Sequence, residues 1–151
     1  MPITSDDRRF MQLALEEARI GLSEGGIPIG SVLVIDGQVR GRGRNRRVQS
    51  GSPILHGETD CLQNAGRLTA ADYRRATLYT TLSPCEMCTG AILLYKIPRV
   101  VMAENRTFTG AEETLARHGV ELLNLESEAA VRMMQEFIRD NPELWNEDIG
   151  E

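Results

Sequence analysis

The sequence TLYTTLSPCEMCTGAILLY, residues 77–95, contains the pattern of a strand followed by a helix. Residues 78–81 are apolar or β-branched and predict a buried strand, and residues 83–94 predict the helix. Cys85 and Cys88 would lie in the first helical turn, three residues apart on one face. Unpaired backbone N–H groups and the helix dipole favour thiolates there. Two neighbouring thiolates predict a cation site at the start of this helix.

The start of the same helix contains typical capping residues. Ser83 can cap the helix, and Pro84 suits the first position because its missing N–H is not needed there. Glu86 would complete a capping box with Ser83. We therefore predict that the helix begins directly after Ser83.

A third candidate ligand is His56, in the sequence LHGE. One imidazole and two thiolates form the ligand set of a catalytic zinc site, which keeps a fourth position open for water. Glu58, two residues after His56, can face the metal without binding it and can act as general acid and base. Burial beside the site would help Glu58 to hold a proton.

Two other interpretations of the cysteines need different partners. Cys85 and Cys88 could form a thiol redox pair, but the H-x-E sequence upstream has no role in disulfide exchange. Cys61 could close a structural zinc site as a fourth ligand, and such a site would belong to a non-enzymatic module. A helix that already runs at His56 would turn Cys61 about 140° away, so a buried small hydrophobe is expected. His118 is expected at the surface, at a helix C-terminus.

The remaining chain alternates between strand and helix patterns. Ser5 is expected to cap a first helix that ends at Gly25, and Asp36-Gly37 predicts the two-residue type I′ turn of a β-hairpin. Strands that alternate with helices imply parallel pairing, whereas the hairpin must be antiparallel. We predict a three-layer α/β/α sandwich on a mixed five-stranded sheet, formed by one domain over residues 1–151. The later elements are expected at 56–66 (helix), 99–104 (strand), 110–119 (helix), 120–125 (strand) and 127–139 (helix).

Composition narrows the possible classes of protein. The chain has 151 residues, 41% of them hydrophobic, which is enough for a sizeable core. No apolar run approaches the length of a membrane span, and the N-terminus lacks the pattern of a signal peptide, so a cytoplasmic location is expected. Three cysteines give no disulfide framework. The net charge of −5 argues against broad nucleic-acid binding.

The combination of H-x-E with P-C-x-x-C is the signature of zinc-dependent nucleobase deaminases. The chain as a whole resembles the small fungal cytosine deaminases of the cytidine and deoxycytidylate deaminase superfamily. This resemblance rests on the stretches EGGIPIG, GRGRN, LHGE, GRL, TLYTTLSPCEMCTGAI, IPR and WNEDIGE. It implies one Zn²⁺ per chain, a homodimer, a small nucleobase substrate, and hydrolytic deamination of cytosine to uracil and ammonia.

The same resemblance implies a set of substrate contacts. Asn45 would hydrogen-bond the ring, the backbone N–H of Gly57 would hold the carbonyl, and the backbone carbonyl of Ser83 would meet the exocyclic amine. An aromatic lid and a C-terminal acid that close over the base would be Phe108, Trp145 and Asp148.

Two residues depart from the family pattern. Val48 stands where the fungal enzymes have a larger aromatic residue, and Arg44 replaces a histidine. Both are expected near the pocket. Another small heterocycle, such as isocytosine, guanine, a pterin or creatinine, therefore remains an alternative substrate.

A tRNA adenosine deaminase is the alternative from the same superfamily. Arginines alternate before the predicted histidine ligand, and such a stripe could follow phosphates. Surface ion pairs or subunit pairing would explain the stripe equally well, and the acidic C-terminal tail NEDIGE argues against RNA. The stripe consists of Arg40, Arg42, Arg44 and Arg46, with Arg47 beside it.

Overall fold

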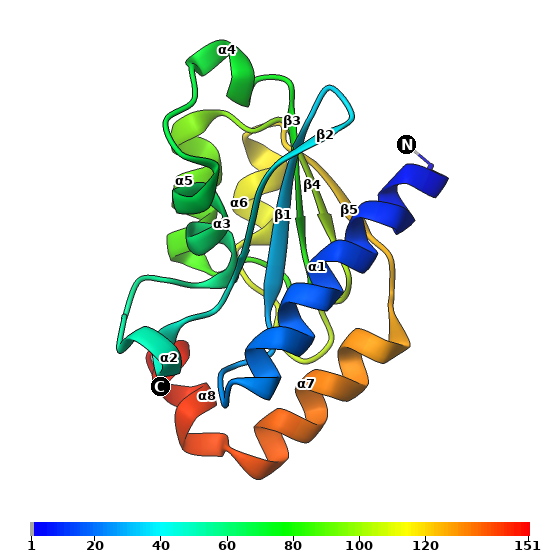
Figure 1. Ribbon diagram of the computed structural model, residues 1–151. Coiled ribbons are helices and arrows are strands. Elements are labelled where there is room, and N and C mark those ends of the chain that lie inside the picture. The colour runs from blue at the N-terminus through cyan, green and yellow to red at the C-terminus, as the bar shows by residue number, and fades with distance from the viewer. Residues whose placement is uncertain (1) are drawn as a thin grey trace.

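A mixed five-stranded sheet with the order β2-β1-β3-β4-β5 forms the middle layer of the protein (Figure 1). The computed structural model describes residues 2–151. β1 pairs antiparallel with β2 and β3, whereas β3-β4 and β4-β5 are parallel. The predicted mixed five-stranded sheet is confirmed. The strands are β1 (Gly30–Ile35), β2 (Gln38–Arg44), β3 (Ala76–Thr80), β4 (Arg99–Met102) and β5 (Glu121–Asn124).

Helices cover both faces of the sheet. α1 and α7 contribute to the hydrophobic cluster on one face, and α3, α5 and α6 contribute to the cluster on the other. Within the part of the chain that the structure describes, no helix is both long and apolar enough to cross a membrane. The helices are α1 (Ser5–Ser23), α2 (Arg47–Ser50), α3 (Gly57–Ala65), α4 (Ala70–Tyr73), α5 (Glu86–Tyr95), α6 (Glu112–Arg117), α7 (Glu128–Asp140) and α8 (Pro142–Asp148).

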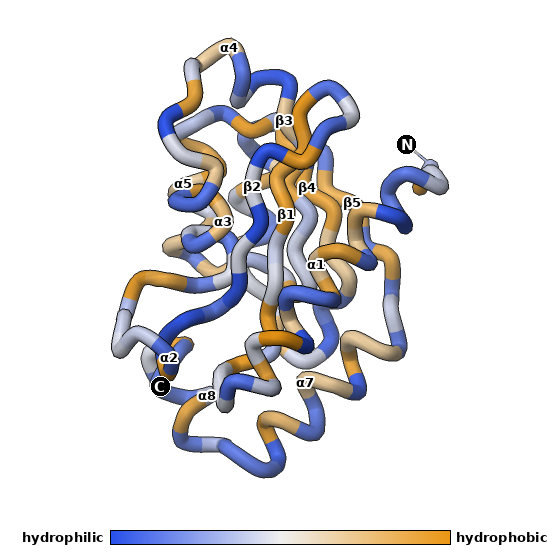
Figure 2. The backbone as a smooth tube through the Cα atoms, viewed as in Figure 1, coloured by the Kyte–Doolittle hydropathy of each residue, from blue (hydrophilic) through white to orange (hydrophobic). Residues whose placement is uncertain are grey.

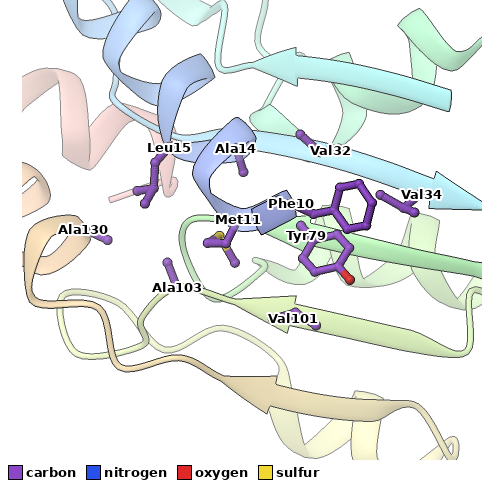
Figure 3. Close-up of a cluster of buried hydrophobic side chains, with 10 residues drawn as sticks. All are labelled: Phe10, Met11, Ala14, Leu15, Val32, Val34, Tyr79, Val101, Ala103 and Ala130. Atoms are coloured by element: carbon purple, nitrogen blue, oxygen red, sulfur yellow. The ribbon is translucent and has the colours of Figure 1, made fainter. Parts of the chain in front are cut away.

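β1 is buried along its whole length because side chains of a strand alternate between two covered faces. Val32 and Val34 pack under α1 with Phe10 and Tyr79 (Figure 3). Leu33 and Ile35, which alternate with them along β1, belong to the hydrophobic cluster on the other face of the sheet, together with residues of α3 and α5. Figure 2 shows the resulting concentration of apolar residues along the central strands.

The predicted hairpin turn is confirmed at Asp36 and Gly37, which have φ angles of 52° and 76°. A type I′ turn needs positive φ at both positions. Behind the hairpin, α3 packs very closely on β2, because a Cβ atom on Gly43 would lie 2.2 Å from the backbone nitrogen of Cys61. This close packing fixes α3, and with it His56, against the sheet.

Helix starts differ from the predictions in two places. α1 is capped by Thr4 rather than Ser5, because the Thr4 hydroxyl accepts from the Asp7 N–H at 3.1 Å and the Asp7 carboxylate accepts from the Thr4 N–H at 3.0 Å. α5 begins at Glu86 with Cys85 as its N-cap, so the predicted capping box of Ser83 and Glu86 is wrong. The Ser83 hydroxyl instead donates to Glu112 and accepts from the backbone N–H of Gly110. The predictions omit three short helices, α2, α4 and α8, although α4 begins with a local capping box of Thr69 and Asp72.

A buried ion pair ties α1 to the sheet. The Asp7 carboxylate accepts from both Arg99 terminal nitrogens at 2.8 Å and from the Tyr79 hydroxyl at 2.7 Å. The hydrogen bonds from Arg99 hold the pKa of Asp7 well below its ordinary value. A depressed carboxyl pKa stabilises the fold above the unfolded pKa of about 4, and this contribution disappears as the pH falls.

We therefore expect Asp7→Asn to lower the free energy of unfolding by roughly 2 kcal/mol at pH 7, the scale of lost charged hydrogen bonds, because the half-buried Arg99 guanidinium keeps only Glu121 as a carboxylate partner. The difference from wild type should shrink as the pH falls below about 4. Asp6→Asn is the matched control, since Asp6 pairs with Arg9 at the surface. Denaturant titrations at several pH values measure both variants, and a pH-independent loss would contradict the ionic explanation.

Candidate metal centre and active site

Two helix starts bring the predicted metal ligands together. His56 is the N-cap of α3, Cys85 is the N-cap of α5, and Cys88 is the third residue of α5. The His56 Nδ1 atom lies 3.4 Å from Cys85 Sγ and 3.7 Å from Cys88 Sγ. Tetrahedral zinc, with Zn–N near 2.0 Å and Zn–S near 2.3 Å, separates neighbouring ligand atoms by about 3.6 Å. The three side chains are therefore positioned to hold one metal ion.

Cys61 lies outside this group. Its thiol is fully buried and donates to the Gly41 carbonyl at 3.4 Å. Among residues 2–151, the group of side chains that could hold a metal contains His56, Cys85 and Cys88. A metal held by these three side chains would keep a fourth position for water, as a catalytic site requires.

We expect purified protein to carry about one Zn²⁺ per chain, and Cys61→Ser should retain it because Cys61 is not a ligand. Cys88→Ser should lose most of the metal, since it removes a thiolate ligand. Elemental analysis of the purified variants measures the content. Loss of zinc from Cys61→Ser would mean that the site is closed and structural.

A carboxylate orients the histidine. His56 Nε2 lies 3.2 Å from Asp148 Oδ1, which leaves Nδ1 directed at the two sulfurs. Hydrogen-bonded carboxylates fix the tautomer of metal-binding histidines in this way. Burial opposes a charged imidazole, but hydrogen bonds to Asp148 and Cys85 outweigh it and raise the pKa of His56 to about 10. A metal ion would take the place of that proton on Nδ1.

The two thiols have different acidities. The hydrogen bond from Cys88 is the largest influence on Cys85 and, together with His56, lowers the pKa of Cys85 to about 4. The same interaction, together with burial, raises the pKa of Cys88. The lowered pKa of Cys85 favours its thiolate, which is the form that binds a metal.

Glu58 lies in the pocket beside these ligands, although it does not belong to the metal-binding group. Its side chain is buried, and burial followed by the negative charge at Cys85 raises the pKa of Glu58 to about 7. This carboxyl group can hold or release a proton near neutral pH.

A small pocket opens over the metal ligands and encloses about 270 Å³ of empty space, including its mouth. The enclosed space that another molecule could occupy is about 20 Å³, which is room for one water molecule beside the metal ligands. Phe108 and Trp145 meet edge to face, with ring centroids 5.8 Å apart. The residues that line the pocket are Ile29, His56, Glu58, Leu82, Ser83, Cys85, Phe108, Trp145, Asp148 and Ile149.

Four of the six expected substrate contacts line this pocket, and two do not. Ser83, Phe108, Trp145 and Asp148 are in the lining, and Ile29, Leu82 and Ile149 are additional members that the sequence did not indicate. These three are apolar residues in segments that only the fold brings together. They were missed because an isolated apolar residue gives no sign of facing a ligand rather than the core.

The other two expected contacts lie just behind the pocket. The Asn45 side chain is fully buried and donates to Asp148 at 3.1 and 3.2 Å. Gly57 is the first residue of α3, and its backbone N–H is one that the helix itself does not use. A Cβ atom on Gly57 would lie 3.1 Å from the Ile29 side chain, so a glycine fits there well.

The two departures from the family pattern lie away from the pocket lining. Arg44 pairs with Glu17 on α1 at 2.8 Å and with Glu24 at 3.0 Å. Val48 lies on α2, and 39% of its surface is exposed. Neither residue is part of the pocket lining, because Arg44 points toward α1 and Val48 is exposed on α2.

Carboxylates neutralise most of the arginine stripe. Within residues 2–151, Arg40 is the one member of the stripe without an ion pair. An arginine that is already paired is a poor phosphate ligand, so the ion-pair interpretation fits better than an RNA track. The pairs are Arg42 with Glu16 and Glu17, Arg44 with Glu17 and Glu24, Arg46 with Asp60, and Arg47 with Glu147 and Asp148.

Two carboxylates that the sequence did not indicate form hydrogen bonds with the loop before α6, which contains Phe108. Glu104 is completely buried and accepts from the backbone N–H groups of Arg106 and Thr107 at 2.7 and 3.0 Å. Glu112 accepts from the Ser83 hydroxyl at 2.6 Å. The available signal was the position of Glu104 at the carboxyl end of a parallel strand, where sites of α/β proteins gather.

Comparisons with known proteins agree with this geometry. Residues 4–104 match the family model described as the cytidine and deoxycytidylate deaminase zinc-binding region. The chain is 53% identical to a cytosine deaminase of Candida albicans over 99% of this chain and 100% of that protein. It is 42% identical to a tRNA-specific adenosine deaminase of Streptococcus pyogenes over 74% of this chain and 72% of that protein.

The fold is similar to that of a solved tRNA:A34 deaminase. The TM-score is 0.67 at 32% identity, and the match covers 80% of this chain and 99% of the other. The sequence resemblance and the arrangement of the metal ligands therefore lead to one family. The chain belongs to the cytidine and deoxycytidylate deaminase zinc-binding family.

Proposed function

We propose that this protein hydrolytically deaminates a free nucleobase, with cytosine as the first candidate, to give uracil and ammonia. The observation that carries the proposal is the 53% identity to the C. albicans cytosine deaminase over the whole chain, which includes α8. α8 contributes Trp145 and Asp148 to the pocket. A pocket closed by the chain's own C-terminus suits a free base better than a polynucleotide.

The metal ligands in this proposal are His56, Cys85 and Cys88. Zinc, when bound, supplies an activated water near neutral pH. Glu58 would take one proton from the attacking water and pass it to the ring nitrogen, and would then move the second proton of that water to the departing amine, because its buried carboxyl group faces the same pocket. The reaction consumes one water and releases one ammonia.

The remaining contacts would orient the ring. The N–H of Gly57 donates to the ring carbonyl, and the backbone carbonyl of Ser83 accepts from the exocyclic amine. The Ser83 hydroxyl is already bonded to Glu112 and to the Gly110 N–H, which supports a role for its backbone instead. Phe108, Trp145 and Asp148 close over the base, with Asn45 holding Asp148 from behind.

An ammonia-release assay over a panel of substrates tests this proposal. The panel contains cytosine, 5-substituted cytosines, isocytosine, guanine, a pterin, creatinine and cytidine. We expect the highest kcat/KM for cytosine. Higher activity on another heterocycle would mean that the proposed reaction is correct but that cytosine is not the preferred substrate.

A tRNA adenosine deaminase is the second candidate, supported by the S. pyogenes relative and by the solved tRNA:A34 deaminase. Those matches cover 74% and 80% of this chain, whereas the cytosine deaminase match covers 99%. Deamination of a tRNA anticodon loop, without activity on free bases, would establish this alternative.

We also propose that the protein is a homodimer. The sequence of α5 is apolar on nearly all sides, and such helices are normally covered. Met87, Leu94 and Tyr95 of this helix are nevertheless exposed, with Leu94 at 68%. A second copy of the chain would bury them. Light scattering should give twice the mass of one chain, and Leu94→Glu should give the monomer; a monomeric wild type would refute the proposal.

A cytoplasmic role in pyrimidine salvage is part of the same proposal. All three cysteines are free thiols, which suits a reducing compartment. Conversion of cytosine to uracil would return a free base to the pyrimidine pool. Cell fractionation would test the location.

A further inference from the structure

We propose that Arg47 is a positioning residue that holds α8 over the pocket and so keeps Asp148 and Trp145 in the pocket wall. This inference deepens the proposed function and rests on it. It also gives a role to an arginine that, from the sequence, resembled part of a phosphate-binding stripe.

Arg47 links two segments that are far apart in the sequence. Its guanidinium donates from Nε to Asp148 Oδ1 at 3.0 Å and from Nη1 to Glu147 Oε1 at 3.0 Å. Its backbone N–H donates to Asn45 Oδ1, also at 3.0 Å. These contacts join α2 to the C-terminal end of α8, and the two helices lie side by side in Figure 1. Arg47 therefore connects the segment before His56 to the last residues of the chain.

Asp148 needs a positive partner in this position. Its side chain is only 2% exposed, and a buried carboxylate without compensation is costly. The Asn45 amide, which also donates to Asp148, is neutral. His56 Nε2 also contacts Asp148 Oδ1 at 3.2 Å, and the guanidinium of Arg47, whose side chain is only 16% exposed, adds a full positive charge. This pairing keeps Asp148 directed at the pocket and at His56.

The rest of α8 is held by apolar contacts at its middle. Trp145 packs in a cluster with Ile27, Ile29 and Leu82 and is 6% exposed. Chain ends fray unless they are tied down, and a helix of this length is marginal without tertiary support. Glu147 and Asp148 end α8, and the two bonds from Arg47 fix this end together with the packing of Ile149 on the same cluster and the bonds from Asn45 to Asp148.

Loss of these bonds should mainly affect substrate binding. If α8 is docked for a smaller fraction of the time, the apparent affinity for substrate falls by that fraction. Substrate contacts with Asp148 and Trp145 would restore docking at saturation. KM should therefore rise while kcat changes little, whereas general unfolding would lower both activity and zinc content.

The test compares Arg47→Gln with Arg42→Gln. Arg42 is a matched control because it is another paired arginine of the stripe, bonded to Glu16 and Glu17 on α1. Trp145 is the single tryptophan of the chain, so its fluorescence reports on α8 without interference. In the zinc-loaded Arg47→Gln protein we expect stronger acrylamide quenching and roughly a tenfold higher KM for cytosine, the scale of one lost charged hydrogen bond. Zinc content should stay the same, and Arg42→Gln should match wild type in all three.

Equal quenching and equal KM in Arg47→Gln and Arg42→Gln would overturn the inference. If Arg47→Gln does not fold, Arg47→Lys decides, because lysine keeps the charge but cannot bond both carboxylates in the same geometry. Quenching of Arg47→Lys should exceed that of wild type, and wild-type quenching would refute the proposal. Failure of the proposed function would look different: wild type would not deaminate cytosine, while the quenching comparison would still show whether Arg47 holds α8.

Discussion

Replacement of Glu58 by Gln should lower the turnover of cytosine by at least ~10²-fold, the usual scale for the loss of a general acid and base. Gln keeps the shape of the side chain and can still form hydrogen bonds, but it cannot carry a proton between water and the ring. The fold and the zinc should be unaffected, because Glu58 is not one of the side chains that could bind the metal. Steady-state ammonia release and elemental analysis measure the two effects separately.

Glu86→Gln is the matched control for this variant. Glu86 is also a carboxylate near the metal ligands, but it is exposed on the first turn of α5. Its loss should change turnover far less than the loss of Glu58. Substantial turnover by Glu58→Gln would show that another group moves the protons.

Truncation after Asn141 should abolish deamination of small bases, because it removes α8 and with it Trp145 and Asp148. Removal of a buried tryptophan side chain alone costs roughly 3–5 kcal/mol. The metal should bind more weakly, by about 10- to 100-fold, because His56 loses the carboxylate that orients it. The assay therefore uses saturating zinc. Asp148→Asn, which keeps α8 and Trp145, should reduce activity less than truncation.

The same truncation separates the free-base function from the RNA alternative. α8 and the residues after it are acidic and would repel phosphate, so their removal should preserve or raise activity on tRNA. If the protein acts on tRNA, neutralising Arg40, Arg42 and Arg46 should lower its activity on tRNA and make that activity less dependent on salt concentration. Deamination of tRNA by the full-length chain, without activity on cytosine, would refute the proposed function although the metal chemistry would stand.

Local patterns in the sequence were sufficient to predict the sheet and the metal ligands. Alternating apolar residues and the Asp36-Gly37 turn depend only on neighbours in the chain, so the hairpin could be located without tertiary information. His56, Cys85 and Cys88 were identifiable because metal chemistry restricts the residue types and because helix starts favour thiolates. The resemblance to the fungal cytosine deaminases added the contacts at the C-terminus, including Trp145.

The pairing of polar groups across the chain depends on the tertiary structure. The sequence predicted that Ser83 caps α5, but its hydroxyl bonds Glu112, and Cys85 became the N-cap. The arginine stripe looked like a single surface, yet its members pair with carboxylates from α1, α3 and α8. A charged side chain has many possible partners of similar local preference, and burial selects among them because an unpaired buried charge is costly. Residue types and their spacing were enough to identify the side chains that can bind the metal, whereas the fold places Asp148 against His56 and Arg47 against Asp148.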